Sequence, residues 1–168
     1  MRRLSFSGMK RAVATAIKQK SQFVNPEQHV VLGLRVLAAR LVEPWEKFLK
    51  DTAGLTASQY NALRILRGSH PTRLACSEIS NRMIARDPDV TRLVDRLSTS
   101  GLVERVRAEH DRRVVEVGIT PKGLALVEQL DPHVSRMPKA MVGHLGEAKL
   151  KRLAQLLDEV LADLGTFP

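Results

Sequence analysis

The sequence predicts a mainly helical protein that carries one small β-hairpin. Over most of its 168 residues, hydrophobic side chains recur at steps of three and four, which is typical of helices that bury one face. Between residues 102 and 119 they alternate with polar side chains instead, as in paired strands. The length is that of one domain and allows a substantial core.

The helix before the hairpin is the best-defined element. Its hydrophobic stripe is formed by Val90, Leu93, Val94 and Leu97. We expect Asp87 to be the N-cap, with Pro88 in the first turn, where a missing N–H costs nothing. Gly101 should end the helix in the left-handed conformation. The opposite face then carries Asp89, Thr91, Arg92, Asp95 and Arg96.

The hairpin follows directly, with strand candidates at residues 102–107 and 115–119. The connection at residues 108–113 is too long for a tight two-residue turn, so its tip should project. That tip contains Asp111, Arg112 and Arg113. Thr120 and Pro121 then start another helix.

A helix followed at once by a hairpin with arginines at its tip is the arrangement of a winged helix-turn-helix. The chain resembles the MarR family of bacterial transcriptional regulators over residues 30–164. The matching residues, in order, are Leu55-Thr56 with Gln59 and Leu63, Ser77-Glu78-Ile79, Thr91 to Leu97 with Gly101 to Arg105, and Asp111 and Arg113 with Ile119-Thr120 and Gly123. The resemblance implies a winged helix-turn-helix lobe joined to a helical dimerisation platform.

Three helices are expected before the one with Asp87 as its N-cap. A long amphipathic helix covers residues 30–49 after an Asn25-Pro26-Glu27 start, and Pro44 inside it means either a kink or a restart. Thr56 caps the second helix, which runs through residue 67 with Tyr60, Leu63 and Leu66 inward.

The third helix is short, at residues 76–83, with Ile79 and Met83 as its buried pair. Ala75 stands where the family commonly has a capping serine or threonine. Ser77 can cap this helix instead, which would shift its start slightly.

The C-terminal region is also helical. Pro132 and Pro138 should bend or split the helix that starts at Pro121. A final helix from residue 147 has a hydrophobic seam formed by Leu150, Leu153, Leu157, Val160 and Leu164. We expect this seam and the first long helix, from two copies of the chain, to form a homodimer platform.

The expected organisation is a basic N-terminal arm or leader at residues 1–25 and one domain at 26–168. Within that domain, the lobe covers about 52–120 and the dimerisation helices about 27–50 and 121–164. Residues 1–25 hold six basic and no acidic residues out of a net charge of +9. They are either a solvated leader or an arm that contacts a polyanion, and charge alone confers no sequence specificity.

The recognition helix supplies the candidate base contacts. Arg92 comes first, because a guanidinium can bind a guanine edge in bidentate fashion. Thr91 suits a phosphate or a thymine methyl group, and Asp89 either orients an arginine or reads a cytosine amine. The role of Arg96 is ambiguous, because several neighbours compete for it: Asp95, Arg92 and nearby phosphates. Residues 87–123 hold seven basic and seven acidic residues, so placement matters there rather than net charge.

At the hairpin tip, Arg112 and Arg113 can reach an A·T-rich minor groove. The resemblance implies that Arg113 makes this contact while Asp111 holds the geometry of the wing. Four further arginines are either phosphate contacts or ordinary surface residues: Arg82, Arg86, Arg105 and Arg107.

The sequence indicates no enzyme, no cofactor and no metal site. The five histidines lack metal-ligand spacing, and no phosphate-binding glycine loop or nucleophile motif is present. The single Cys76 fits a reducing cytosol and a small buried side chain, with a redox role left open because a helix N-terminus can lower a thiol pKa. No apolar run suits a membrane span or a secretory signal, so we expect a cytoplasmic, nucleoid-associated protein.

Regulators that resemble this family often respond to small aromatic acids or phenolic compounds. The candidate effector residues are Trp45, Tyr60, Arg40 and Met83, although tryptophan and methionine at helical spacing are more often core. Such a ligand would act by favouring one spacing of the recognition helices.

Three functions follow from the sequence. The first is a homodimeric regulator that binds double-stranded DNA at an inverted-repeat operator, where two recognition helices enter successive major grooves. The second is a basic architectural protein that binds DNA without sequence specificity. The third is an interaction module that kept the fold and lost DNA recognition.

Overall fold

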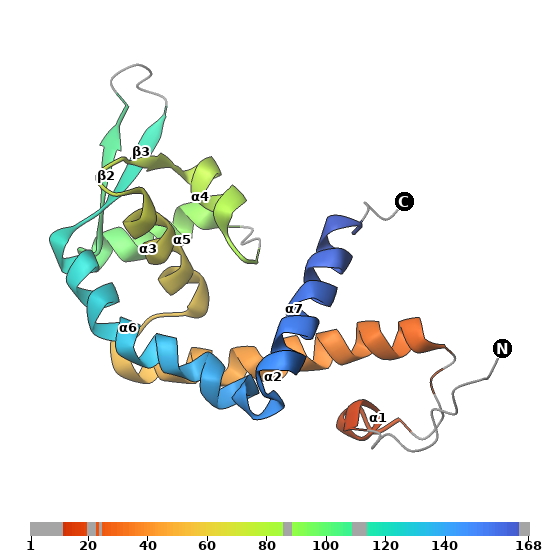
Figure 1. Ribbon diagram of the computed structural model, residues 1–168. Coiled ribbons are helices and arrows are strands. Elements are labelled where there is room, and N and C mark those ends of the chain that lie inside the picture. The colour runs from red at the N-terminus through yellow and green to blue at the C-terminus, as the bar shows by residue number, and fades with distance from the viewer. Residues whose placement is uncertain (1–11, 20–22, 24, 86–88, 109–113, 165–168) are drawn as a thin grey trace. The chain divides into compact units, whose positions relative to one another are not determined.

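The computed structural model describes residues 12–19, 23, 25–85, 89–108 and 114–164. The chain divides into two compact units, residues 1–57 and 58–168. The first contains α1 (Ala12–Ala16) and α2 (Pro26–Ala53). The second contains the sheet and the other helices, and Figure 1 shows the hairpin projecting from it. No helix among the described residues is long and apolar enough to cross a membrane.

The long helix of the first unit begins after Asn25, as the sequence predicts, but it continues to Ala53, past the expected end at residue 49. Asn25 caps α2 by accepting a hydrogen bond from the Gln28 N–H at 2.8 Å. Gly54 ends it in the left-handed conformation, with φ at 65°. The helix runs through Pro44 without a break, which excludes a restart there. Its Gly33 faces α1, where a Cβ would make an ordinary van der Waals contact, 3.5 Å from Val13 Cγ2.

The second unit begins with the winged helix. Its elements are α3 (Ala57–Ser69), β1 (Leu74–Ala75), α4 (Cys76–Arg82), α5 (Val90–Thr99), β2 (Val103–Arg107) and β3 (Val115–Ile119). The strands form an antiparallel sheet in the order β1-β3-β2. The largest fully buried side chains here are Leu63, Leu66, Ile79, Val94, Leu97 and Val117. The predicted hairpin and the inward faces of α3, α4 and α5 are thus confirmed.

One expected helix start and one alternative cap are wrong. The recognition helix α5 is capped by Asp89 and begins at Val90, whereas Asp87 was the expected N-cap. Asp89 has a non-helical backbone, so α5 begins after it, and Asp87 lies outside the described residues. Helix α4 begins at Cys76 behind Ala75, which has no capping side chain, and not at a start shifted to Ser77. Ala75 is held extended by pairing with Glu116 of β3, which fixes where the helix begins.

The C-terminal part consists of α6 (Pro121–Val142), the 3-10 turn η2 (Gly143–Leu145) and α7 (Glu147–Ala162). Thr120 caps α6 by accepting from the Gly123 N–H at 3.1 Å. Helix α6 passes through Pro132 and Pro138 without a break, so these prolines do not split it. The chain turns after η2 at Gly146, whose φ is 75°.

Candidate nucleic-acid interface

Both ends of α5 are fixed by hydrogen bonds. At its start, Asp89 Oδ1 accepts from the Arg92 N–H at 3.1 Å. At its end, Gly101 has φ at 71° and donates its N–H to the Ser98 carbonyl at 2.9 Å. Lys122 Nζ, at the start of α6, donates to the Ser100 carbonyl at 2.8 Å. A cation at a helix C-terminus also interacts favourably with the helix dipole. These contacts hold α5 with its polar face outward.

The outward face carries the residues that the sequence proposes as base contacts. Arg92 has a side chain that is 79% exposed, and its Nε lies 3.4 Å from Asp89 Oδ2. Thr91 and Arg96 are also exposed. An open hollow of about 420 Å³ lies along this face, lined by Arg92, Asp95, Arg96, Thr99 and Ser100. The structure therefore brings Thr91, Arg92 and Arg96 together on one accessible surface.

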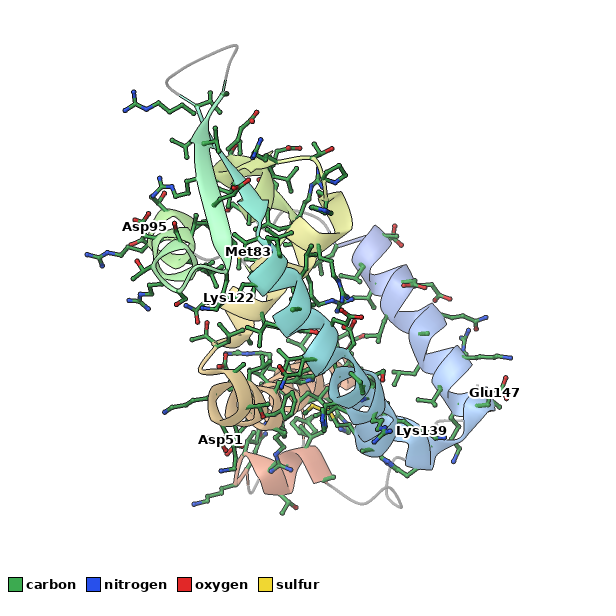
Figure 2. The ribbon with its side chains drawn as sticks, turned by 90° about the vertical axis from the view of Figure 1, so that its left-hand side faces the viewer. Asp51, Met83, Asp95, Lys122, Lys139 and Glu147 are labelled. Atoms are coloured by element: carbon green, nitrogen blue, oxygen red, sulfur yellow. The ribbon has the colours of Figure 1, made fainter. Side chains whose placement is uncertain are left out.

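Asp95 has a partner that sequence reasoning did not foresee. Its Oδ1 receives a hydrogen bond and ion pair from Arg105 Nη1 on β2. Figure 2 shows the labelled Asp95 on α5, beside the hairpin. Because this carboxylate is taken by Arg105, it is not the competitor for Arg96 that the sequence suggests. Among the described side chains, none forms an ion pair with Arg96.

The hairpin is regular up to its tip. Strands β2 and β3 pair from Val103 opposite Ile119 to Arg107 opposite Val115. Beyond them, the Ala108 N–H donates to the Val114 carbonyl at 3.0 Å. The predicted wing residues Asp111, Arg112 and Arg113 lie outside the described residues, as do Arg86, Asp87 and Pro88 of the preceding connection.

The remaining basic candidates differ in how they are engaged. Arg82 contacts Glu78 Oε1 at 3.1 Å and Ser69 Oγ at 3.0 Å, so its guanidinium is held within the lobe. Arg107 is exposed at the end of β2. Sequence reasoning missed Lys122 because its partner, the Ser100 carbonyl, lies on another element and no local pattern links the two.

The effector candidates divide between the two units. Arg40 is exposed and Trp45 half-buried on α2, in the first unit. Tyr60 and Met83 are buried in the second, at 5% and 8% exposure. Burial raises the pKa of the Tyr60 hydroxyl, while the nearby Arg64 partly offsets this effect. Tyr60 and Met83 are thus core side chains of their own unit.

Cys76 is half-buried at the start of α4. Burial raises the pKa of its thiol, and the nearby Arg105 lowers it to a smaller extent. The net shift is thus toward the neutral thiol, away from a reactive thiolate. Among the described residues, no group of three or more histidine, cysteine, aspartate or glutamate side chains could hold a metal ion.

Known proteins match both the sequence and the fold. The MarR family model matches residues 55–115. The transcriptional repressor IacR of Pseudomonas putida is 30% identical over 128 residues, which are 76% of this chain and 75% of that protein. A MarR transcription factor from Planctomyces limnophilus is 37% identical, with a TM-score of 0.62 over 82% of this chain and 98% of that one. BpsR of Bordetella bronchiseptica, whose DNA binding is regulated by 6-hydroxynicotinic acid, is 26% identical, with a TM-score of 0.70 over 85% and 97%.

The region matched by the family model contains α3, α4, α5 and β2, which are the elements that build and orient the arginine-bearing surface. The relatives named above are transcriptional regulators rather than enzymes. With this fold, this surface and these relatives, the chain belongs to the MarR family of DNA-binding transcriptional regulators.

Proposed function

We propose that the protein acts as a homodimer that recognises an inverted-repeat operator in double-stranded DNA. The observation that carries this proposal is the outward face of α5, where Arg92 and Arg96 lie four residues apart on a helix fixed at both ends. An exposed helix of this kind fits the major groove, and its arginines can read guanine edges.

The apolar surface of α7 supports the homodimer. None of its residues is buried, and five of its large hydrophobic side chains are 38–68% exposed: Leu153, Leu156, Leu157, Val160 and Leu161. Helix α2 also exposes large hydrophobic side chains, at Val30, Val31, Leu37 and Val42. A surface with several exposed large apolar side chains marks a protein interface. The same surface on a second copy of the chain can cover it. We assign α2, α6 and α7 to the dimerisation platform and residues of about 52–120 to the lobe.

In this arrangement each residue has a defined role. Arg92 reads a base edge, and Asp89 orients the Arg92 side chain. Thr91 contacts a phosphate or a thymine methyl group, and Arg96 contacts a phosphate. Arg112 and Arg113 extend into the adjacent minor groove, with Asp111 orienting the wing.

We also propose repression, modulated by a small aromatic acid, as the regulatory mode. IacR is named a repressor, and BpsR responds to 6-hydroxynicotinic acid. The candidate effector residues are Trp45, Tyr60, Arg40 and Met83, of which Arg40 and Trp45 are the accessible ones. Acting on the chromosome places the protein in the cytoplasm, at the nucleoid.

The alternative is an architectural protein that binds any duplex through its basic N-terminal segment. Residues 1–25 hold six basic residues and no acidic residue, which favours this alternative. Deleting residues 1–11 removes four of them, Arg2, Arg3, Lys10 and Arg11, and leaves α1 in place. If the segment contributes only phosphate attraction, this deletion leaves the ratio of operator to scrambled affinity unchanged.

A salt titration on an operator duplex and on a scrambled duplex separates the two functions. We expect the operator to be bound more tightly at every salt concentration, because base contacts add to the shared phosphate attraction. Equal affinity for both duplexes would refute sequence-specific regulation and leave the architectural function.

A further inference from the structure

Two consecutive residues of β2 each form an ion pair. Successive side chains of a strand point to opposite faces, so Glu104 and Arg105 extend in opposite directions. Glu104 Oε1 binds Arg73 Nη2 at 2.6 Å, and Arg105 binds Asp95 on α5. Strand β2 is therefore held on one face by the recognition helix and on the other by the residue before β1.

The pair between Glu104 and Arg73 crosses the central strand of the sheet. Glu104 lies opposite Gly118 of β3, and β3 separates β2 from β1. A Cβ at Gly118 would lie 3.2 Å from Arg73 Cγ and 3.4 Å from Glu104 Oε1. Glycine at this position leaves room for the Arg73 side chain to reach across β3, so this pair belongs to the architecture of the sheet.

The pair between Arg105 and Asp95 has a different consequence, since it joins the two elements proposed to contact DNA. The Asp95 side chain is 48% exposed and the Arg105 side chain 33% exposed, so both lie near the DNA-facing surface. Asp95 also lines the hollow on the outer face of α5 together with Arg92 and Arg96. An unpaired carboxylate there would repel phosphates, whereas a paired one can serve as a fixed point for the hairpin.

We propose that Asp95 and Arg105 form a positioning pair that sets the angle of the hairpin against the recognition helix. Neither residue contacts a base. The pair directs the wing toward the groove next to the one that α5 occupies, and it leaves Arg96 available for the DNA backbone. This proposal rests on the proposed function, because it concerns how one duplex is held by α5 and the wing together.

The substitution Asp95→Asn separates this proposal from a simple charge effect. Removing a negative charge from a DNA-facing surface should by itself strengthen binding. Loss of a positioning pair should instead weaken operator binding by about two- to fivefold, the range expected for a partly exposed ion pair. Asp95→Glu keeps the carboxylate and should restore most of the affinity. Equal or tighter binding by Asp95→Asn would overturn the proposal.

A double-mutant cycle with Arg105→Gln gives a second, independent readout. If the two residues act as a pair, the double variant should bind the operator no more weakly than Arg105→Gln alone. If Arg105 contacts a phosphate instead, Arg105→Gln should reduce the slope of log affinity against log salt concentration by about 0.9. The effects of the two substitutions on affinity should then multiply. Multiplying effects would also refute the positioning pair.

Hydroxyl-radical footprints locate the change on the DNA. With Asp95→Asn, protection at the flank reached by the wing should decrease, while protection at the half-site read by α5 persists. The matched control is Glu78→Gln, which breaks the comparably exposed pair with Arg82 within α4 and should leave the footprint unchanged. Uniform weakening over the whole footprint would refute the proposal. If the unaltered protein fails to distinguish operator from scrambled DNA, the proposed function itself is wrong.

Discussion

Arg92 is the residue on which base recognition depends in this account. Its backbone is fixed, because its N–H is bound by the Asp89 cap in the first turn of α5. Its side chain is largely exposed and forms an ion pair with Asp89, in which Nε and Oδ2 are 3.4 Å apart. An exposed ion pair of this kind contributes little energy, so a guanine edge can replace the carboxylate at small cost.

Replacing Arg92 by alanine should therefore weaken operator binding and leave the dimer intact. Loss of a bidentate contact should reduce discrimination at one base pair by about 1–3 kcal/mol. Gel shifts on operators substituted at single positions measure this loss. The control is Arg136→Ala, which removes an exposed arginine of α6 and should bind like the parent. Parental affinity and discrimination in Arg92→Ala would show that the site assignment is wrong.

Gly123 lies where the first turn of α6 contacts the backbone before β2. A Cβ at this position would lie 2.2 Å from the Leu102 carbonyl oxygen and 2.8 Å from Ile119 Cγ1. The backbone contact cannot be relieved by a side-chain rotation, so Gly123→Ala should destabilise the fold by about 1–3 kcal/mol or more.

Urea unfolding tests this effect against Gly68→Ala, a substitution in α3 with no atom within 4 Å of the new Cβ. That control should be neutral or should raise the free energy of unfolding by about 0.4–1 kcal/mol. Equal stability of the two variants would contradict the tight contact at Gly123.

Cys76 should react slowly with alkylating reagents. Burial raises its thiol pKa, so at a given pH the folded protein holds less thiolate than the unfolded chain. The rate of iodoacetamide labelling should rise with pH around a midpoint above the one measured in urea. The midpoint reports the pKa separately from steric access, and a midpoint below that of the unfolded chain would restore the redox-sensor interpretation.

Residue-scale features were predictable from the sequence where local rules determine them. The Asn25 and Thr120 caps and the Gly101 terminator follow from capping preferences alone. The cap of α5 was placed two residues too early, because Asp87 and Asp89 are equivalent capping types and a proline lies between them. The pairing of Asp95 with Arg105 could not be predicted, since it joins a helix to a strand and depends on tertiary geometry.

At the scale of elements, the spacing of hydrophobic residues predicted most of the helices and strands correctly, whereas the positions of prolines did not predict helix breaks correctly. The stripe of α5 is a buried face, whereas β3 is buried at three consecutive residues, Val117, Gly118 and Ile119, and not at alternate ones. Helices α2 and α6 nevertheless continue through Pro44, Pro132 and Pro138. A proline removes one backbone hydrogen bond, and the remaining hydrogen bonds of a long helix can keep it continuous. Strand β1 was missed because two residues are too few to show a period.

The exposed seam of α7 leads to a prediction about the dimer. Leu157 is 38% exposed in the chain and should be buried by the partner copy. Leu157→Asp would then place a charge in an apolar interface and shift the protein to monomers at micromolar concentration. Analytical ultracentrifugation measures this shift, with Gln155→Asp on the polar face of the same helix as the control. A Leu157→Asp variant that remains dimeric would exclude α7 from the interface.

At the scale of the whole molecule, bulk charge and recognition are separated along the chain. The basic excess lies mainly in residues 1–25, whereas residues 87–123, which include α5 and both strands of the hairpin, hold as many acidic as basic residues. Long-range attraction to DNA is therefore not confined to the recognition surface, and we expect specificity to depend on a few arginines of α5 and the hairpin. A two-fold dimer doubles this surface and fixes the spacing of its two copies.

Hydroxyl-radical footprinting on the DNA upstream of the protein's own coding region tests the two-fold recognition most directly. We expect two equivalent protected half-sites related by an inverted repeat, with their centres about 10 base pairs apart. Protection of one half-site alone, or protection spread evenly along the duplex, would contradict recognition by a symmetric pair of α5 helices.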